Sequence, residues 1–171
     1  MALRKIVIEG DEILRKKSKE VTNYNARLHE LLDDMWETMA EADGVGLAAP
    51  QVGILRRVVV IDATPREIED ENSLSTNGTF AAEEQTKVEL INPVIFYTEG
   101  EIDDKEGCLS VPGVIGIVKR PEVVKVRAND RYGEEFEITG RGLLAKALCH
   151  EIDHLEGTLF TDIAESFEEQ E

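Results

Sequence analysis

The chain has 171 residues, of which 42% are hydrophobic and only 5% aromatic, so it is long enough for one domain with a mostly aliphatic core. Its formal net charge is −17, and almost all of the acidic excess follows residue 60. Such a field repels phosphates and anionic lipids, which argues against direct DNA binding and against a role at a membrane surface.

The N-terminal region carries no targeting signal that we recognise. Its apolar run, Ile6 to Ile8, is shorter than the apolar core of a signal peptide, and no segment approaches the roughly 18 apolar residues of a spanning helix. We therefore expect a cytoplasmic protein whose two cysteines, Cys108 and Cys149, stay reduced and serve packing, metal binding or catalysis.

The first elements in chain order are an extended arm or short strand at 6–8 and a short helix capped by Asp11. Residues 25–42 form the clearest helix outside the motifs described below, and Gly44 suits its end. Five apolar residues repeat there at helical spacing: Leu28, Leu31, Leu32, Met35 and Met39.

Strands and one loop follow. The β-branched run at 56–61 predicts a strand that is buried on both faces. The polar, acidic segment 65–87 predicts a surface loop insertion, either functional or decorative. Further strands are expected at 88–91 and 94–98, on either side of Asn92-Pro93, and at 122–128 and 135–139.

The C-terminal part contains the second strong helix, at 142–155, which Gly157 closes. The end of the chain, with an acidic tail at 164–171, is expected to fray. No linker divides the sequence, so we expect a single domain over residues 1–171.

The most specific motif is the segment His-Glu-Ile-Asp-His at 150–154. Residues four apart on a helix share a face, so His150 and His154 can bind one metal ion, while the adjacent Glu151 can reach water at that ion. A surface helix that carries two histidines by chance is the alternative, and it is weak because the chain has only three histidines.

A metal hydrolase usually needs a third protein ligand. We favour Cys108, in the segment Glu-Gly-Cys-Leu-Ser at 106–110, over His29, because a thiolate suits Zn²⁺ or Fe²⁺. Gly107 would let the backbone approach the metal closely. A buried core thiol is the alternative for Cys108.

A third segment, Gly-Val-Gly-Leu-Ala-Ala-Pro-Gln at 44–51, lacks the features of a phosphate-binding loop. It predicts a strand or tight loop whose backbone binds an extended peptide, and Gln51 adds an amide donor and acceptor.

These three segments, in this order, resemble the signature motifs of the peptide deformylase family. The opening residues Ile-Val-Ile-Glu-Gly-Asp-Glu-Ile-Leu-Arg-Lys-Lys-Ser also resemble that family, and the similarity runs from about residue 4 to residue 163. Cys108 precedes His150 by 42 residues, so the three motifs together are far more specific than the helical motif alone.

The resemblance implies a metal-dependent hydrolase that removes the N-formyl group from the initiator methionine of nascent polypeptides and releases formate. It implies that Cys108, His150 and His154 hold one divalent ion, usually Fe²⁺, with Zn²⁺, Ni²⁺ or Co²⁺ as alternatives. A metal-bound hydroxide would attack the formyl carbonyl while Glu151 acts as general acid and base.

The same resemblance assigns the oxyanion to the Gln51 side chain and the Leu109 backbone N–H, and substrate binding to Gly46. We expect Gly107 to bind substrate as well. It also implies an α+β fold in which antiparallel sheets surround the helix that carries residues 150–154, with the helix at 25–42 packed outside.

Methionine selectivity requires an apolar pocket beside the metal. Leu143 and Ala147 fall on the same helical stripe as the two histidines, and Val45 would face them; simple core packing is the alternative. Glu106 and Asp153 either orient the ligands or Gln51, or form structural pairs with Arg120.

Three departures from the family pattern matter. Val114-Ile115 stands where many bacterial members carry an arginine, and the 65–87 segment looks longer than in compact members. The acidic tail replaces the basic helix with which some members dock on ribosomal RNA, so transient ribosome association is not supported, and we expect a monomer. A peptidase and a catalytically silent family member are the competing hypotheses.

Overall fold

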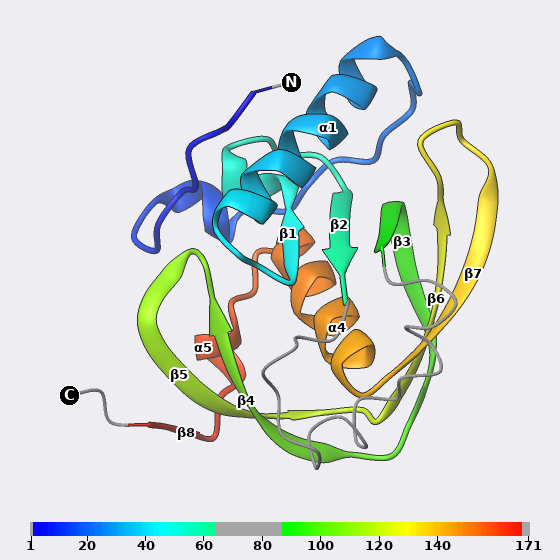
Figure 1. Cartoon of the computed structure of the whole chain (residues 1–171). Helices are drawn as coiled ribbons and strands as arrows, with labels where there is room; N and C mark the ends of the chain where they lie inside the picture. The colour runs from blue at the N-terminus through cyan, green and yellow to red at the C-terminus, as the bar shows by residue number, and fades with distance from the viewer. Residues whose placement is uncertain (1, 64–86, 169–171) are drawn as a thin grey trace.

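The computed structural model describes residues 2–63 and 87–168, which form two antiparallel sheets and two main helices (Figure 1). The predicted α+β class with antiparallel sheets is confirmed. The predicted loop insertion lies outside the described residues except for Lys87, which begins a strand. No helix in the described ranges has the length and apolar character needed to cross a membrane.

The larger sheet has the strand order β1-β2-β3-β6-β7, and all its pairings are antiparallel. Its strands are β1 (Gly46–Ala48), β2 (Val58–Asp62), β3 (Lys87–Glu99), β6 (Val123–Asn129) and β7 (Glu135–Arg141). The smaller sheet has the order β4-β5-β8, with β4 at Ile102–Cys108, β5 at Val111–Arg120 and β8 at Ser166–Phe167.

Strand β2 is buried on both faces, as its β-branched run predicts. Val58 and Val60 join the apolar cluster under helix α1 (Ala26–Glu41), whereas Val59 and Ile61 join the cluster of helix α4 (Leu143–Leu155). Alternate residues of a strand point to opposite faces, so one strand anchors both helices. The larger sheet therefore lies between α1 and α4.

Helix α1 matches its prediction closely. The Asn25 side chain caps it by accepting a hydrogen bond from the Leu28 N–H at 3.1 Å, and the five predicted apolar residues are all buried. Helix α4 lies at the centre of the molecule and is followed by Gly157 in the left-handed conformation (φ 81°) (Figure 1). A Cβ at Gly157 would lie 2.5 Å from the Arg15 carbonyl oxygen, so the close approach also requires glycine. The short helix α5 (Phe160–Ile163) follows.

The prediction of separate strands at 88–91 and 94–98 is wrong, because both segments belong to the single strand β3. The ladder with β6 shifts register between Ile91 and Val94, where Asn92 has a positive φ of 54°. The Asn92 side chain bonds to both the N–H and the carbonyl of Val21, at 2.9 and 3.0 Å, and so holds a bulge inside a continuous strand.

The hairpin of β4 and β5 was not predicted. Residues 102–105 of β4 are exposed and polar apart from Ile102, so they show no apolar alternation, and the strand is held by its pairing with β5. The expectation that the C-terminal end frays is wrong for Ser166 and Phe167, which pair with β5 as β8; residues 169–171 lie outside the described part.

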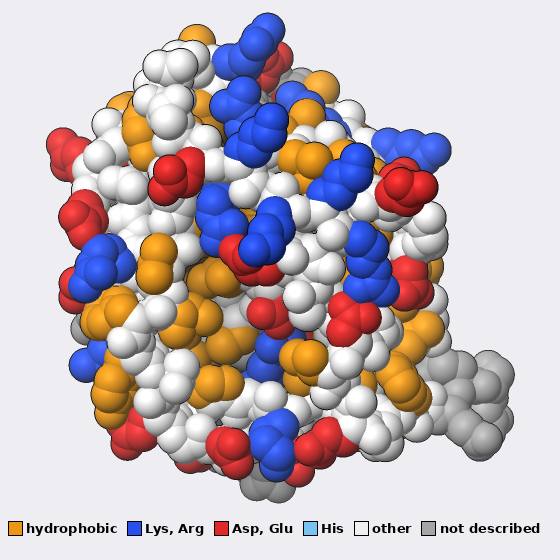
Figure 2. Space-filling view, turned by 180° about the vertical axis from the view of Figure 1, so that it is seen from behind, with side chains coloured by type: hydrophobic (Ala, Val, Ile, Leu, Met, Phe, Trp, Pro, Cys, Tyr) orange, Lys and Arg blue, Asp and Glu red, His pale blue; other side chains and the backbone are white. Residues whose placement is uncertain are grey.

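The N-terminal arm is extended and runs into the short 3₁₀ helix η1 (Glu12–Arg15), which Asp11 caps as predicted. The Val7 N–H donates to the Gln51 carbonyl at 2.7 Å, and the Glu9 N–H donates to the Ser110 carbonyl at 2.8 Å. The arm therefore bridges the two segments that carry these acceptors. Figure 2 shows Lys and Arg side chains gathered over the upper part of the rear face.

Candidate metal centre

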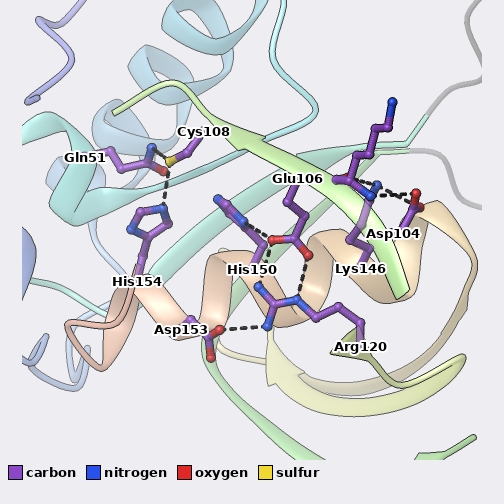
Figure 3. Close-up of polar contacts among 10 residues, drawn as sticks. Gln51, Asp104, Glu106, Cys108, Arg120, Lys146, His150, Asp153 and His154 are labelled. Atoms are coloured by element: carbon purple, nitrogen blue, oxygen red, sulfur yellow. Dashed lines mark hydrogen bonds and ion pairs between the residues drawn. The ribbon is translucent and has the colours of Figure 1, made fainter. Parts of the chain in front are cut away.

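Three possible metal ligands meet where the end of β4 reaches helix α4. Cys108 is the last residue of β4, and His150 and His154 lie one helical turn apart on α4. One donor atom from each of the three residues can be chosen so that all lie within 4.8 Å of one another. The Cys108 sulfur is 3.4 Å from Nε2 of His154 (Figure 3).

The surroundings of the two imidazoles suit a bound cation. Nδ1 of His150 is engaged by Glu106 at 2.9 Å, which leaves its Nε2 for a ligand role. Burial, together with the nearby charges of His150 and Arg120, lowers the pKa of His154 to about 3, so this imidazole is neutral as a ligand must be. A thiolate and two imidazoles within this spacing fit Zn²⁺ or Fe²⁺.

Behind His150 lies a buried ion-pair network. Glu106 accepts two hydrogen bonds from Arg120, at 2.7 and 2.9 Å, and Arg120 also donates to Asp153 at 2.9 Å (Figure 3). Burial would raise the pKa of Glu106, but the bonds from Arg120 and His150 outweigh it and lower the pKa to about 2. Both alternatives left open by the sequence therefore hold for Glu106, which orients His150 and pairs with Arg120, while Asp153 pairs with Arg120.

Glu151 is a buried carboxylate that lies in the pocket lining. Its Oε1 makes no hydrogen bond with the described residues, and burial raises its pKa to about 7. Gly46 on β1 faces it so closely that a Cβ at Gly46 would lie 2.7 Å from Glu151 Oε2. The glycine is thus required by a close approach to this carboxylate, a reason that the sequence did not reveal.

Gln51 has a fixed orientation in the 3₁₀ helix η2 (Ala49–Val52). Its Oε1 accepts a hydrogen bond from the Ala48 N–H at 2.9 Å, and its Nε2 lies 3.1 Å from Ser110 Oγ and 3.6 Å from Cys108 Sγ. The amide N–H₂ therefore faces the cysteine. Leu109 follows Cys108 in the turn between β4 and β5.

A pocket of about 410 Å³ opens beside these groups. The residues predicted to bind substrate, Val45, Gly46, Gly107, Leu143 and Ala147, all line it, together with Gln51, Cys108, Leu109, His150 and Glu151. His154 lies behind the lining, and His29 is elsewhere, with its Nε2 2.8 Å from the Arg131 carbonyl oxygen.

Other residues complete the lining of the pocket. Val114 and Ile115, noted above as a departure from the family pattern, belong to it, and so do Lys105 and Lys146, which the motifs did not predict. Lys146 precedes His150 by four residues, so the helical stripe could have revealed it. Ser110, fully buried against Gln51, gave no signal beyond its place in the motif.

Comparisons with known proteins agree with one another. A sequence model described as polypeptide deformylase matches residues 3–170. The chain is 53% identical over 162 residues to a peptide deformylase of Caldicellulosiruptor bescii, which covers 95% of this chain and 86% of that protein. It is 51% identical over 171 residues to a peptide deformylase of Thermoanaerobacter pseudethanolicus, and this match covers 100% of this chain and 95% of that protein.

Solved structures give the same result. A peptide deformylase from Legionella pneumophila superposes with a TM-score of 0.80 at 44% identity, covering 94% of this chain and 85% of that one. A peptide deformylase from Synechococcus elongatus in complex with actinonin has a TM-score of 0.80 at 38% identity, and the match covers 95% of this chain and 79% of that one.

Proposed function

Because the chain belongs to the polypeptide deformylase family and is therefore an enzyme, we propose that it removes the N-formyl group from formyl-methionine at the start of nascent polypeptides and releases formate. The observation that carries the proposal is the meeting of Cys108, His150 and His154 beside the buried carboxylate of Glu151, at the wall of a pocket.

The three ligand residues would hold one divalent ion, with Fe²⁺ as the first choice and Zn²⁺, Ni²⁺ or Co²⁺ as alternatives. When bound, such an ion supplies a Lewis acid that polarises the formyl carbonyl and lowers the pKa of water. The Glu106 carboxylate keeps the His150 ring in the orientation that leaves its Nε2 toward the site.

Glu151 would move the proton. The pKa of Glu151, about 7, lies near the working pH. The carboxyl group can therefore take a proton from the attacking water and return it to the leaving amine. Its free Oε1 and its place in the pocket lining support this role, because the group is not occupied by a structural partner among the described residues.

Gln51 and Leu109 would stabilise the oxyanion. The Gln51 carbonyl is occupied by Ala48, so its amide N–H₂ is the end that faces the site, and the Leu109 backbone follows Cys108 directly. One well-placed donor of this kind is worth roughly 100-fold in rate.

The pocket would hold the methionine side chain against Val45, Leu143 and Ala147, while Gly46 and Gly107 leave room for the substrate main chain. A comparison of formyl-Met and formyl-Ala peptides tests this assignment. We expect a preference of about 10-fold or more for formyl-Met, since burial of a side chain of this size is worth roughly 1.5–3 kcal/mol.

The substrate also suggests the setting. Nascent chains arise in the cytoplasm, so we place the enzyme there. We also expect it to act as a monomer. The acidic C-terminal segment offers no support for docking on ribosomal RNA.

The direct test is formate release from formyl-Met-Ala-Ser, with metal content measured on the same sample. We expect Glu151→Ala to keep the metal and lose at least about 100-fold in rate, and Cys108→Ala to lose the metal. Full turnover by Glu151→Ala, or unchanged metal content in Cys108→Ala, would contradict the assigned roles. An internal peptide without a formyl group serves as the control for peptidase activity.

A further inference from the structure

Helix α4 also touches β4 outside the three motifs, where Lys146 meets Asp104. Lys146 Nζ donates to Asp104 Oδ2 at 3.1 Å and to the Lys105 backbone carbonyl at 2.9 Å (Figure 3). The Lys146 side chain is only 22% exposed. Because one of the two bonds is to main chain, the lysine holds the backbone of β4 as well as a side chain.

This contact continues a regular series between the helix and the strand. The paired residues are Lys146 with Asp104, His150 with Glu106, and His154 with Cys108. Each step is four residues along α4, a rise of about 6 Å, and two residues along β4, a rise of about 6.6 Å. The two spacings nearly match, so helix and strand stay in step over all three contacts.

The pairing of β4 with its other neighbour, β5, is irregular near its last residue, although Cys108 itself pairs with Val111. The ladder between β4 and β5 shifts register between Glu106 and Cys108, just before the metal-ligand cysteine. Regular pairing with β5 therefore does not by itself fix where the Cys108 sulfur lies relative to the imidazoles. The contacts with α4 contribute to that alignment, beside the Gln51 Nε2 group that lies 3.6 Å from the sulfur.

We infer that Lys146 is a positioning residue for the metal centre, which acts through the Lys146–Asp104 contact by holding β4 in register on α4. The inference rests on the proposed metal-binding role of Cys108, His150 and His154. Lys146, which lines the pocket, would then strengthen metal binding in addition to any contact that it makes with substrate.

The test is the affinity of the full chain for Co²⁺, measured by competition with a chelator and by the thiolate–cobalt absorption band. Lys146→Met keeps the apolar stem and removes the ammonium, and we expect about 5-fold weaker Co²⁺ binding with an altered band. This is less than the 10- to 100-fold loss typical when a direct partner of a ligand is removed. Lys146→Arg, which keeps the charge and the donors, should restore most of the affinity, and Asp104→Asn should weaken it in the same direction.

Lys119→Met is the matched control. Lys119 lies on β5, not on α4, and it pairs with Asp103 of β4 at 3.2 Å. We expect unchanged Co²⁺ affinity and an unchanged band in this variant.

Two results would overturn the inference in distinguishable ways. In the first, the unmutated chain binds Co²⁺ tightly and Lys146→Met binds it equally well. The Lys146–Asp104 contact would then be only a stabilising ion pair, even if the variant lowered the unfolding temperature of the metal-free protein. Absence of a tight site in the unmutated chain would overturn the proposed function together with it.

Discussion

The buried carboxylate of Glu106 offers the sharpest test of how the proposed metal centre is supported. Glu106→Gln keeps the shape of the side chain and removes its charge. The carboxylate accepts three hydrogen bonds, two from Arg120 and one from His150. An amide has only one acceptor oxygen, so its N–H₂ group would face at least one of these donors.

The loss of stability follows from the burial of Arg120, which is 5% exposed. Removing one partner of a buried ion pair costs about 3–5 kcal/mol. Asp153 still accepts one bond from Arg120, so we expect the lower end, about 3 kcal/mol. For a chain of this length that lowers the unfolding temperature by about 6–12 °C.

Calorimetry of the metal-free protein measures this shift, and chelator competition measures the accompanying loss of metal affinity, which we expect to be about 10-fold or more. Glu137→Gln is the control, since Glu137 pairs with Arg127 at 3.4 Å on an exposed face and should change stability by less than about 1 kcal/mol. An unfolding temperature within 2 °C of the unmutated protein, which corresponds to roughly 1 kcal/mol or less, together with unchanged metal affinity, would show that Glu106 does not support the site.

Three further predictions follow from single contacts. Gly46→Ala places a Cβ against Glu151 Oε2, so formate release should fall about 100-fold while metal content stays constant; equal turnover would show that the carboxylate is free to move. Ser110→Ala removes the hydroxyl that lies 3.1 Å from Gln51 Nε2, so kcat should fall about 10-fold with little change in KM, as steady-state assays would show. Burial would raise the pKa of Asp34, but bonds from the Ala2 N–H and from Arg4 lower it overall. The stability that the ionised Asp34 contributes is therefore fully present above its ordinary pKa of 3.8. It is lost as the pH falls through the lower pKa of Asp34 in the folded protein. Urea unfolding should give Asp34→Asn a deficit of about 1 kcal/mol at pH 7 that shrinks in acid, and a deficit independent of pH would contradict this.

Local patterns predicted the elements that have strong local signals. The helices at α1 and α4 follow apolar periodicity, and β2 follows a β-branched run, so each is determined by its own residues. The bulge in β3 was missed because Asn92 is held by Val21, 71 residues away. Strand β4 was missed because its polar residues are stabilised by partners on β5 and α4.

The candidate site shows the same division. The motif residues Cys108, His150 and His154, which the sequence placed in one cluster, do lie together in space. The close approach of Gly46 to Glu151 and the alignment of Lys146 on β4 depend on how separate elements pack. A pattern within one segment does not carry that information.

We propose that this chain hydrolyses formyl-methionyl peptides with a metal held by Cys108, His150 and His154. The most direct measurement is formate release from formyl-Met-Ala-Ser by the metal-free chain, purified without oxygen and then titrated with Fe²⁺. We expect no release without metal and a rise in rate that saturates at about one Fe²⁺ per chain, because the site has three ligands for a single ion. Formate release that is independent of metal, or one bound metal per chain with no release under any of Fe²⁺, Ni²⁺, Co²⁺ or Zn²⁺, would contradict it.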